Sequence, residues 1–139
     1  MQKLTHLVFA FLLFLVANIV LKLPMYMSVF VFIGAAIPDL DLKLGGLHRK
    51  AFHNIWFLMI LLFVGFSTSL VNPQVSLALI VGFLSHLISD SLTHMGIMPL
   101  WPIEKPKFNG PFVTGGKSEM IFLVIIIAAI AFIMGGAVL

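Results

Sequence analysis

Residues 82–102, GFLSHLISDSLTHMGIMPLWP, decide how this chain folds. The stretch begins as an apolar helix that carries His86, Asp90 and His94, each four residues from the next. A four-residue step returns to nearly the same face of a helix, about 6 Å further along the axis, so the three side chains are predicted to form one polar stripe. Imidazole and carboxylate groups are common protein ligands of zinc, and ionisable side chains within apolar sequence indicate function by default. Two hydroxyl residues flank the stripe as candidate hydrogen-bond partners, Ser89 and Thr93.

The composition of the whole chain places it in a membrane. Of its 139 residues, 61% are hydrophobic and 9% are charged, and the mean hydropathy is +1.18. We therefore expect an all-α fold, a polytopic membrane helix bundle, with residues 1–139 forming a single domain. The absence of cysteine excludes disulfide bonds, cysteine-ligated zinc and a thiol nucleophile. Nucleic-acid binding is not expected, because the eight Lys and Arg residues form no clustered basic face.

Apolar segments separated by turn residues predict about five transmembrane helices. These segments cover residues 4–21, 25–37, 51–70, 75–95 and 119–134. The first exceeds the apolar core of a signal peptide and no A-x-A-like cleavage site follows it, so we expect it to be retained. The second reaches only 15 residues when extended back to Leu23, so it either crosses a thin region or is re-entrant. Residues 96–118 are rich in proline and glycine and predict a loop.

Basic residues are distributed asymmetrically if all five segments cross. With a cytoplasmic N-terminus, seven Lys and Arg residues face the cytoplasm and only Lys22 faces the outside. This positive-inside bias predicts a multi-pass protein of the plasma (inner) membrane with its N-terminus in the cytoplasm. The same topology places all five histidines and all three aspartates in one leaflet or at its surface, which indicates a single composite site.

Each polar group also has an ordinary interpretation. A lone histidine near a helix end is more often an interfacial or hydrogen-bonded residue than a ligand, and Asp39 and Asp41 follow Pro38 as turn or cap residues would. A hydrogen bond between His86 and Asp90 would satisfy both without a metal. Two alternatives to an enzyme therefore stay open, a metal-ion transporter or sensor and a non-catalytic membrane protein with a hydrogen-bonded polar core.

Four ordered motifs resemble those of a known family. They are His6, then Pro38-Asp39-Leu40-Asp41, then His48-Arg49 with His53, then His86-x3-Asp90-x2-Thr93-x2-Gly96 followed by Pro99-Leu-Trp-Pro102. Taken together, over roughly residues 4–102, they resemble the LexA-regulated, membrane-bound metal-dependent hydrolase family of YdjM-like inner-membrane proteins. His94 is not part of this shared pattern.

The resemblance implies metal-assisted hydrolysis, and the expected cofactor is a divalent metal, zinc before others, as one ion or two. Two ions about 3.5–4 Å apart suit phosphoester cleavage. The candidate metal ligands are His6, Asp39, Asp41, His53, His86, Asp90 and His94. Arg49 is the expected phosphate contact because its planar fork matches phosphate, His48 is the expected general acid, and Glu119 is a further candidate ligand or base. The expected partners are membrane lipid and an amphiphilic or phosphorylated substrate, such as a phosphoester or a phospholipid-like molecule.

Overall fold

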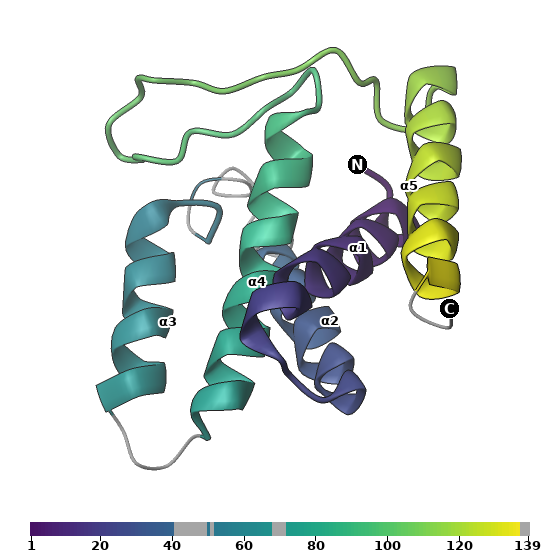
Figure 1. The fold of residues 1–139 in the computed structure, drawn as a ribbon. Helices are drawn as coiled ribbons and strands as arrows, with labels where there is room; N and C mark the ends of the chain where they lie inside the picture. Colours follow the sequence, from purple (N-terminus) through teal and green to yellow (C-terminus); the bar gives the residue numbers. More distant parts are fainter. Residues whose placement is uncertain (41–49, 51, 68–71, 137–139) are drawn as a thin grey trace.

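The chain folds into a helical bundle arranged around one central helix (Figure 1). The computed structural model describes residues 1–40, 50, 52–67 and 72–136. Within them the elements follow in the order α1 (Lys3–Leu21), the 3-10 helix η1 (Met25–Met27), α2 (Ser28–Ala36), α3 (Ile55–Ser67), α4 (Pro73–Ser91) and α5 (Lys117–Gly136). The predicted all-α membrane bundle is confirmed.

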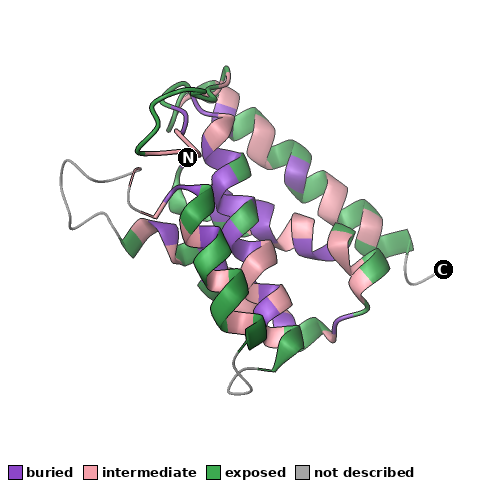
Figure 2. Ribbon diagram, turned by 90° about the vertical axis from the view of Figure 1, so that its left-hand side faces the viewer, coloured by how far each residue is buried: buried purple, intermediate pink, exposed green. Residues whose placement is uncertain are grey.

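Helix α4 is the centre of this arrangement. Helices α1, α2 and α3 all pack against it, and α5 packs against α1 (Figure 1). The buried residues accordingly concentrate in the middle of the bundle, and outward-facing turns are exposed (Figure 2). The outer helices expose large apolar side chains, such as Phe63 on α3 and Phe132 on α5, which are 72% and 82% exposed. Such surfaces suit contact with lipid.

Three of the described helices, α1, α4 and α5, are long and apolar enough to cross a membrane. The second apolar segment is short, as predicted, and covers Met25–Leu40 including η1 and α2. The prediction that the third helix begins at residue 51 is wrong, because α3 begins at Ile55. The reason is a cap: the Asn54 side chain accepts a hydrogen bond from the Phe57 N–H, 2.9 Å away, which satisfies an amide of the first helical turn.

The predicted continuation of the fourth helix to residue 95 is also wrong, because α4 ends at Ser91. Beyond this point the His94 N–H donates to the Phe112 carbonyl at 2.8 Å, outside any helical pattern. Two isolated β-bridges join the first and second halves of the following loop, Thr93 with Phe112 and Ile97 with Phe108. This loop forms the long connection to α5 along the upper edge of Figure 1.

Helices α2 and α4 touch backbone to backbone through two glycines. A Cβ atom at Gly82 would overlap the Val31 carbonyl, and one at Gly34 would overlap the Leu79 carbonyl. Small residues at such crossings let helices in membranes approach closely. The contact therefore brings the end of α2 against the part of α4 that carries His86.

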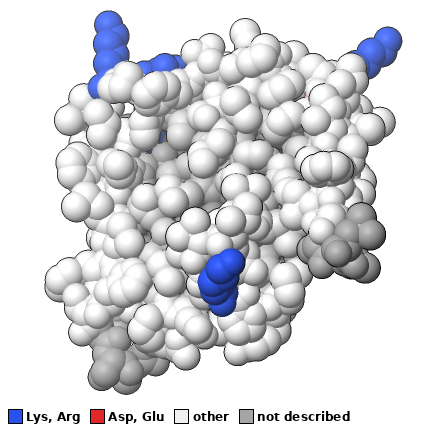
Figure 3. Space-filling model, in the orientation of Figure 1, with Lys and Arg blue, Asp and Glu red and all other residues white. Residues whose placement is uncertain are grey.

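Charge is sparse on the surface that this bundle presents. On the face drawn in Figure 3, basic side chains lie along the upper edge and at one point in the lower half, and the area between them is uncharged. This distribution is that of a membrane protein, whose charged side chains lie at the ends of its apolar helices.

We predict that Gly82→Ala destabilises the protein by about 1–3 kcal/mol, since the added methyl group forces α2 and α4 apart. Thermal unfolding in detergent measures the loss. Gly135→Ala is the matched control, because a Cβ there meets nothing within 4 Å. Equal melting temperatures for the two variants would contradict the close helix contact.

Candidate metal centre

Five imidazole and carboxylate side chains from four parts of the chain converge in the bundle. His6 lies near the start of α1, Asp39 follows α2, His53 precedes α3, and His86 and Asp90 lie near the end of α4. They form two groups, and within each group the donor atoms all lie within 4.8 Å of one another. The first group is His6, His86 and Asp90, and the second is Asp39, His53 and His86. The convergence of these five predicted residues is the central feature of the site.

The cluster is buried apart from one carboxylate. The side chains of His53 and His86 are fully buried, Asp90 is 2% exposed and His6 is 5% exposed. The Asp39 side chain is 27% exposed and connects the cluster to the outside. An ionised carboxylate as buried as Asp90 is stable only with a cation or with several hydrogen-bond donors around it.

Each oxygen of Asp90 faces different partners. Its Oδ1 lies 2.9 Å from the Met1 ammonium and 3.3 Å from His6 Nε2. Its Oδ2 lies 3.6 Å from His53 Nε2 and 3.8 Å from His86 Nε2. Asp90 thus stands between two sets of nitrogen atoms, in the position of a group that two neighbouring cations would share.

The hydrogen bonds of His86 determine which of its nitrogens carries the proton. His86 Nδ1 lies 2.7 Å from the Ala35 carbonyl, which can only accept, so Nδ1 carries the hydrogen. In the neutral ring, Nε2 then presents a lone pair toward His53 Nε2, 3.2 Å away, which can donate a hydrogen bond to it. The carboxylates of Asp39 and Asp90 lie slightly farther from the same nitrogen, at 3.7 Å and 3.8 Å, so a proton or a metal ion could lie among these groups.

The same reasoning applies to His6. The Ser89 hydroxyl donates its hydrogen to the His86 carbonyl at 2.9 Å, so it accepts from His6 Nδ1 at 2.5 Å. His6 Nε2 is then left facing Asp90, and the His6 ring stacks on that of His86 with centroids 4.0 Å apart and planes 1° from parallel. A backbone carbonyl or hydroxyl on the far nitrogen is the usual support of a metal-binding imidazole.

The distances of the second group fit a tetrahedral metal ion. His53 Nε2 and His86 Nε2 lie 3.2 Å apart. Two nitrogens bound to one tetrahedral zinc ion at about 2.0–2.1 Å would lie about 3.3–3.4 Å apart. Asp39 completes this group with a carboxylate oxygen 3.7 Å from His86 Nε2, and these are donors of the type that zinc accepts. Asp90 Oδ2 lies 3.6 Å and 3.8 Å from the same two nitrogens.

His94 does not continue the polar stripe on α4. It lies beyond the end of the helix, it is exposed, and it belongs to neither group of donors in the described chain. The four-residue spacing held only while the backbone stayed helical. Three other predicted site residues lie outside the described residues, namely Asp41, His48 and Arg49.

Glu119 has contacts that indicate an anchoring role. It is 2% exposed, and its carboxylate accepts hydrogen bonds from the Gln2 N–H at 2.6 Å and the Gly115 N–H at 2.7 Å. It belongs to neither donor group of the described chain. Because Gln2 adjoins Met1, Glu119 ties the start of α1 to α5 and so holds the Met1 ammonium beside Asp90.

Sequence reasoning missed the backbone groups of the site. The Ala35 carbonyl and the Met1 ammonium contact the cluster through atoms that every residue or chain start possesses, so no residue type marks them. Lys3 is a further residue that the sequence motifs do not single out, and it lines the pocket beside His6. The predicted role of Ser89 as a hydrogen-bond partner is confirmed.

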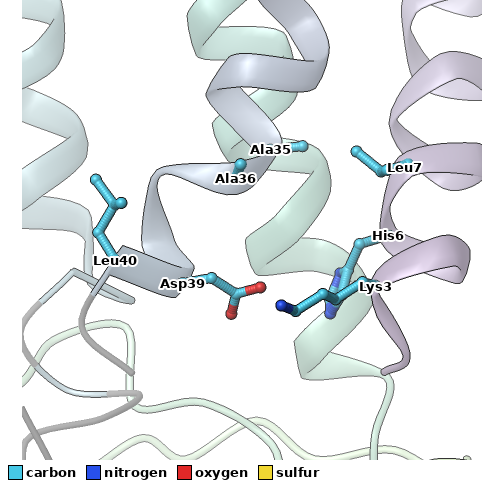
Figure 4. A pocket seen from close by; sticks show the side chains of 7 residues that line it. All are labelled: Lys3, His6, Leu7, Ala35, Ala36, Asp39 and Leu40. Atoms are coloured by element: carbon cyan, nitrogen blue, oxygen red, sulfur yellow. The ribbon is translucent and has the colours of Figure 1, made fainter. Parts of the chain in front are cut away.

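An open pocket of about 270 Å³ adjoins the cluster. Lys3, His6 and Asp39 lie at one end of it, and Leu7, Ala35 and Ala36 lie at the other (Figure 4). Leu40 completes the lining. The pocket therefore offers a small molecule both a cationic side chain and an apolar wall next to the candidate metal ligands.

Comparison with known proteins identifies a family. The family model of the YdjM inner membrane protein matches residues 1–138, so it covers every residue of the cluster. No curated protein and no solved structure matches the chain.

We predict that Glu119→Ala loosens the start of α1, because it leaves two amides without their acceptor at a cost of about 1–3 kcal/mol each. Hydrogen–deuterium exchange at residues 2–6 should accelerate and the melting temperature should fall. Glu104→Ala, on an exposed loop, is the control. Unchanged exchange at these residues in Glu119→Ala would refute the anchoring role.

Proposed function

We propose that this chain, which belongs to the YdjM inner membrane protein family, is a metal-dependent hydrolase of phosphoester-bearing membrane amphiphiles. One observation carries the proposal: the Nε2 atoms of His6, His53 and His86 all lie within 4 Å of the buried carboxylate of Asp90. Because hydrogen bonds occupy the Nδ1 atoms of His6 and His86, a cation is the natural partner of this arrangement.

The residues that would hold the metal follow from the distances. Asp39, His53 and His86 would supply three donors to one ion, with Asp90 Oδ2 beside the two imidazoles, and His6 on the other oxygen of Asp90 would supply the first donor for a second ion. Zinc suits this mixture of nitrogen and carboxylate donors. When bound, such an ion supplies a water-derived nucleophile at neutral pH and polarises the ester that it contacts.

The surrounding residues have distinct tasks in this proposal. The Ala35 carbonyl and the Ser89 hydroxyl orient the two imidazoles. Lys3 holds an anionic phosphate in the pocket, close to His6 and Asp39. Leu7 and the other apolar lining residues exclude water from the side of the ester that is not reacting. His48 as general acid and Arg49 as a second phosphate contact remain part of the proposal, although both lie outside the described residues.

A second candidate is favoured by one contact. The Met1 ammonium, itself buried, lies 2.9 Å from Asp90 Oδ1 and gives this carboxylate a cation without any metal. Under this interpretation the cluster is a hydrogen-bonded polar core of a non-catalytic membrane protein. The two candidates differ in whether the folded protein binds metal stoichiometrically.

We predict that protein purified without chelator or nickel resin holds about one to two equivalents of zinc or a similar metal. His86→Ala and Asp90→Asn should lose this metal and with it the hydrolysis of a panel of phosphomonoesters and phosphodiesters, with and without acyl chains. His94→Ala is the matched control, since His94 is exposed and lies outside the cluster. Elemental analysis and product release measure the two effects.

The opposite result is equally informative. A folded wild-type protein that binds no metal after zinc is supplied would overturn the hydrolase proposal and favour the polar core. Metal that is bound by the wild type and retained in both His86→Ala and Asp90→Asn would show that it sits elsewhere.

A pair of serines tests the orienting hydrogen bond. Both Ser89 and Ser91 donate to a carbonyl three residues earlier, but only Ser89 contacts a cluster imidazole, that of His6. We predict that Ser89→Ala lowers metal affinity roughly 10–100-fold, as is typical when a supporting partner of a metal ligand is lost. Ser91→Ala should leave affinity unchanged, and equal affinities would remove Ser89 from the site. Competition with a zinc-sensitive dye measures both.

A further inference from the structure

We infer that the substrate is a single-chain amphiphile, or one chain of a larger lipid, whose hydrocarbon tail lies in an apolar groove formed by α1, α2 and α5. Its phosphate would lie at Lys3. This inference rests on the proposed function and extends it by naming where the tail binds.

The groove adjoins the polar pocket. Its volume is about 210 Å³, and every lining residue is apolar: Leu7, Val8, Phe11, Phe32 and Ile130. Leu7 also lines the pocket that contains His6 and Asp39. A molecule with its head in the pocket can therefore continue past Leu7 into the groove without leaving the protein surface.

The two hollows together form a gradient of polarity. At one end of the pocket lie the ammonium of Lys3 and the donors of His6 and Asp39, and toward Leu7 the lining becomes apolar (Figure 4). Further along, the groove contains no polar side chain in its lining. This order matches a phosphate ester at one end and a hydrocarbon chain at the other.

The dimensions also suit one leaflet of a bilayer. From Lys3 to Phe11, α1 rises about 12 Å at about 1.5 Å per residue. Half of a hydrocarbon core of about 30 Å is about 15 Å. A tail that follows α1 from Lys3 past Phe11 would therefore run most of the depth of the leaflet that contains its headgroup.

A second apolar groove provides an internal comparison. It also measures about 210 Å³ and is lined mainly by α3, α4 and the loop after α4, including Leu58, Leu84 and Phe108. It shares no lining residue with the pocket of Lys3. We expect it to hold bulk lipid without selecting for a phosphate.

Photo-crosslinking of the metal-loaded protein in phosphatidylcholine vesicles tests the inference. The probe is a single-chain alkyl phosphodiester with a diazirine in the middle of its chain, and the matched probe is the alcohol without the phosphate. We expect the phosphodiester to label the groove residues roughly tenfold more than the alcohol does, the effect of one charge-assisted contact, and Lys3→Gln to remove this excess. A soluble short-chain phosphodiester should compete for the headgroup site.

Variants that fill each groove complete the design. Val8→Trp and Ile130→Trp, which act from different helices, should each abolish the excess labelling and slow hydrolysis of the long-chain probe, while hydrolysis of the short-chain ester continues. Leu84→Trp, in the second groove, should change neither.

The outcomes separate the two proposals. Hydrolysis with equal labelling of both grooves, or labelling that ignores the phosphate, would overturn the tail-binding groove and leave the hydrolase in place. Selective labelling of the groove without any hydrolysis would support the binding site and overturn the hydrolase.

Discussion

The need of a buried carboxylate for positive partners is the constraint on which this structure depends. Asp90 lies inside the bundle at 2% exposure, where an unpaired charge is costly. His6 at the start of α1, His53 in the segment before α3 and His86 one turn earlier on α4 each bring a nitrogen atom to it. Helices whose other contacts are mostly apolar thus meet at a common polar point. The same convergence creates the candidate metal site, so stability and chemistry share their residues.

The close contact of α2 and α4 connects this polar centre to the backbone. Gly34 and Gly82 allow the two helices to meet without intervening side chains. Only at this separation does the Ala35 carbonyl reach His86 Nδ1, 2.7 Å away, and only then does Asp39 follow α2 into the cluster. Two residues without side chains therefore determine the orientation of a ring that carries the proposed chemistry.

Much of the bundle and the core of the site was predictable, because each rests on local pattern. Apolar runs indicate the helices, and His86 and Asp90 share a face while the backbone between them is helical. The prediction failed for His94, where hydrogen bonds from the returning loop end α4, and for the start of α3, where Asn54 caps the helix. These failures arise from contacts between distant or irregular segments, which the spacing of apolar residues along the chain does not reveal. The Ala35 carbonyl and the Met1 ammonium were unpredictable for another reason, since main-chain atoms leave no trace in the pattern of side chains.

The position of the cluster in the bundle also bears on what it can do. Its donors come from the start of α1, the residues after α2, the segment before α3 and the last turns of α4, so in an alternating bundle they share one end. A transport path needs ligands through the whole depth of the membrane, and in the described chain both donor groups lie at this end. A membrane amphiphile, in contrast, presents its ester near the surface and its chain toward the interior. The sequence of Lys3, His6, Leu7 and Phe11 along α1 repeats this order, from a charge through a candidate metal ligand to apolar side chains. Along α1, the order of these side chains therefore matches the order of the parts of such a substrate, from its ester to its hydrocarbon chain.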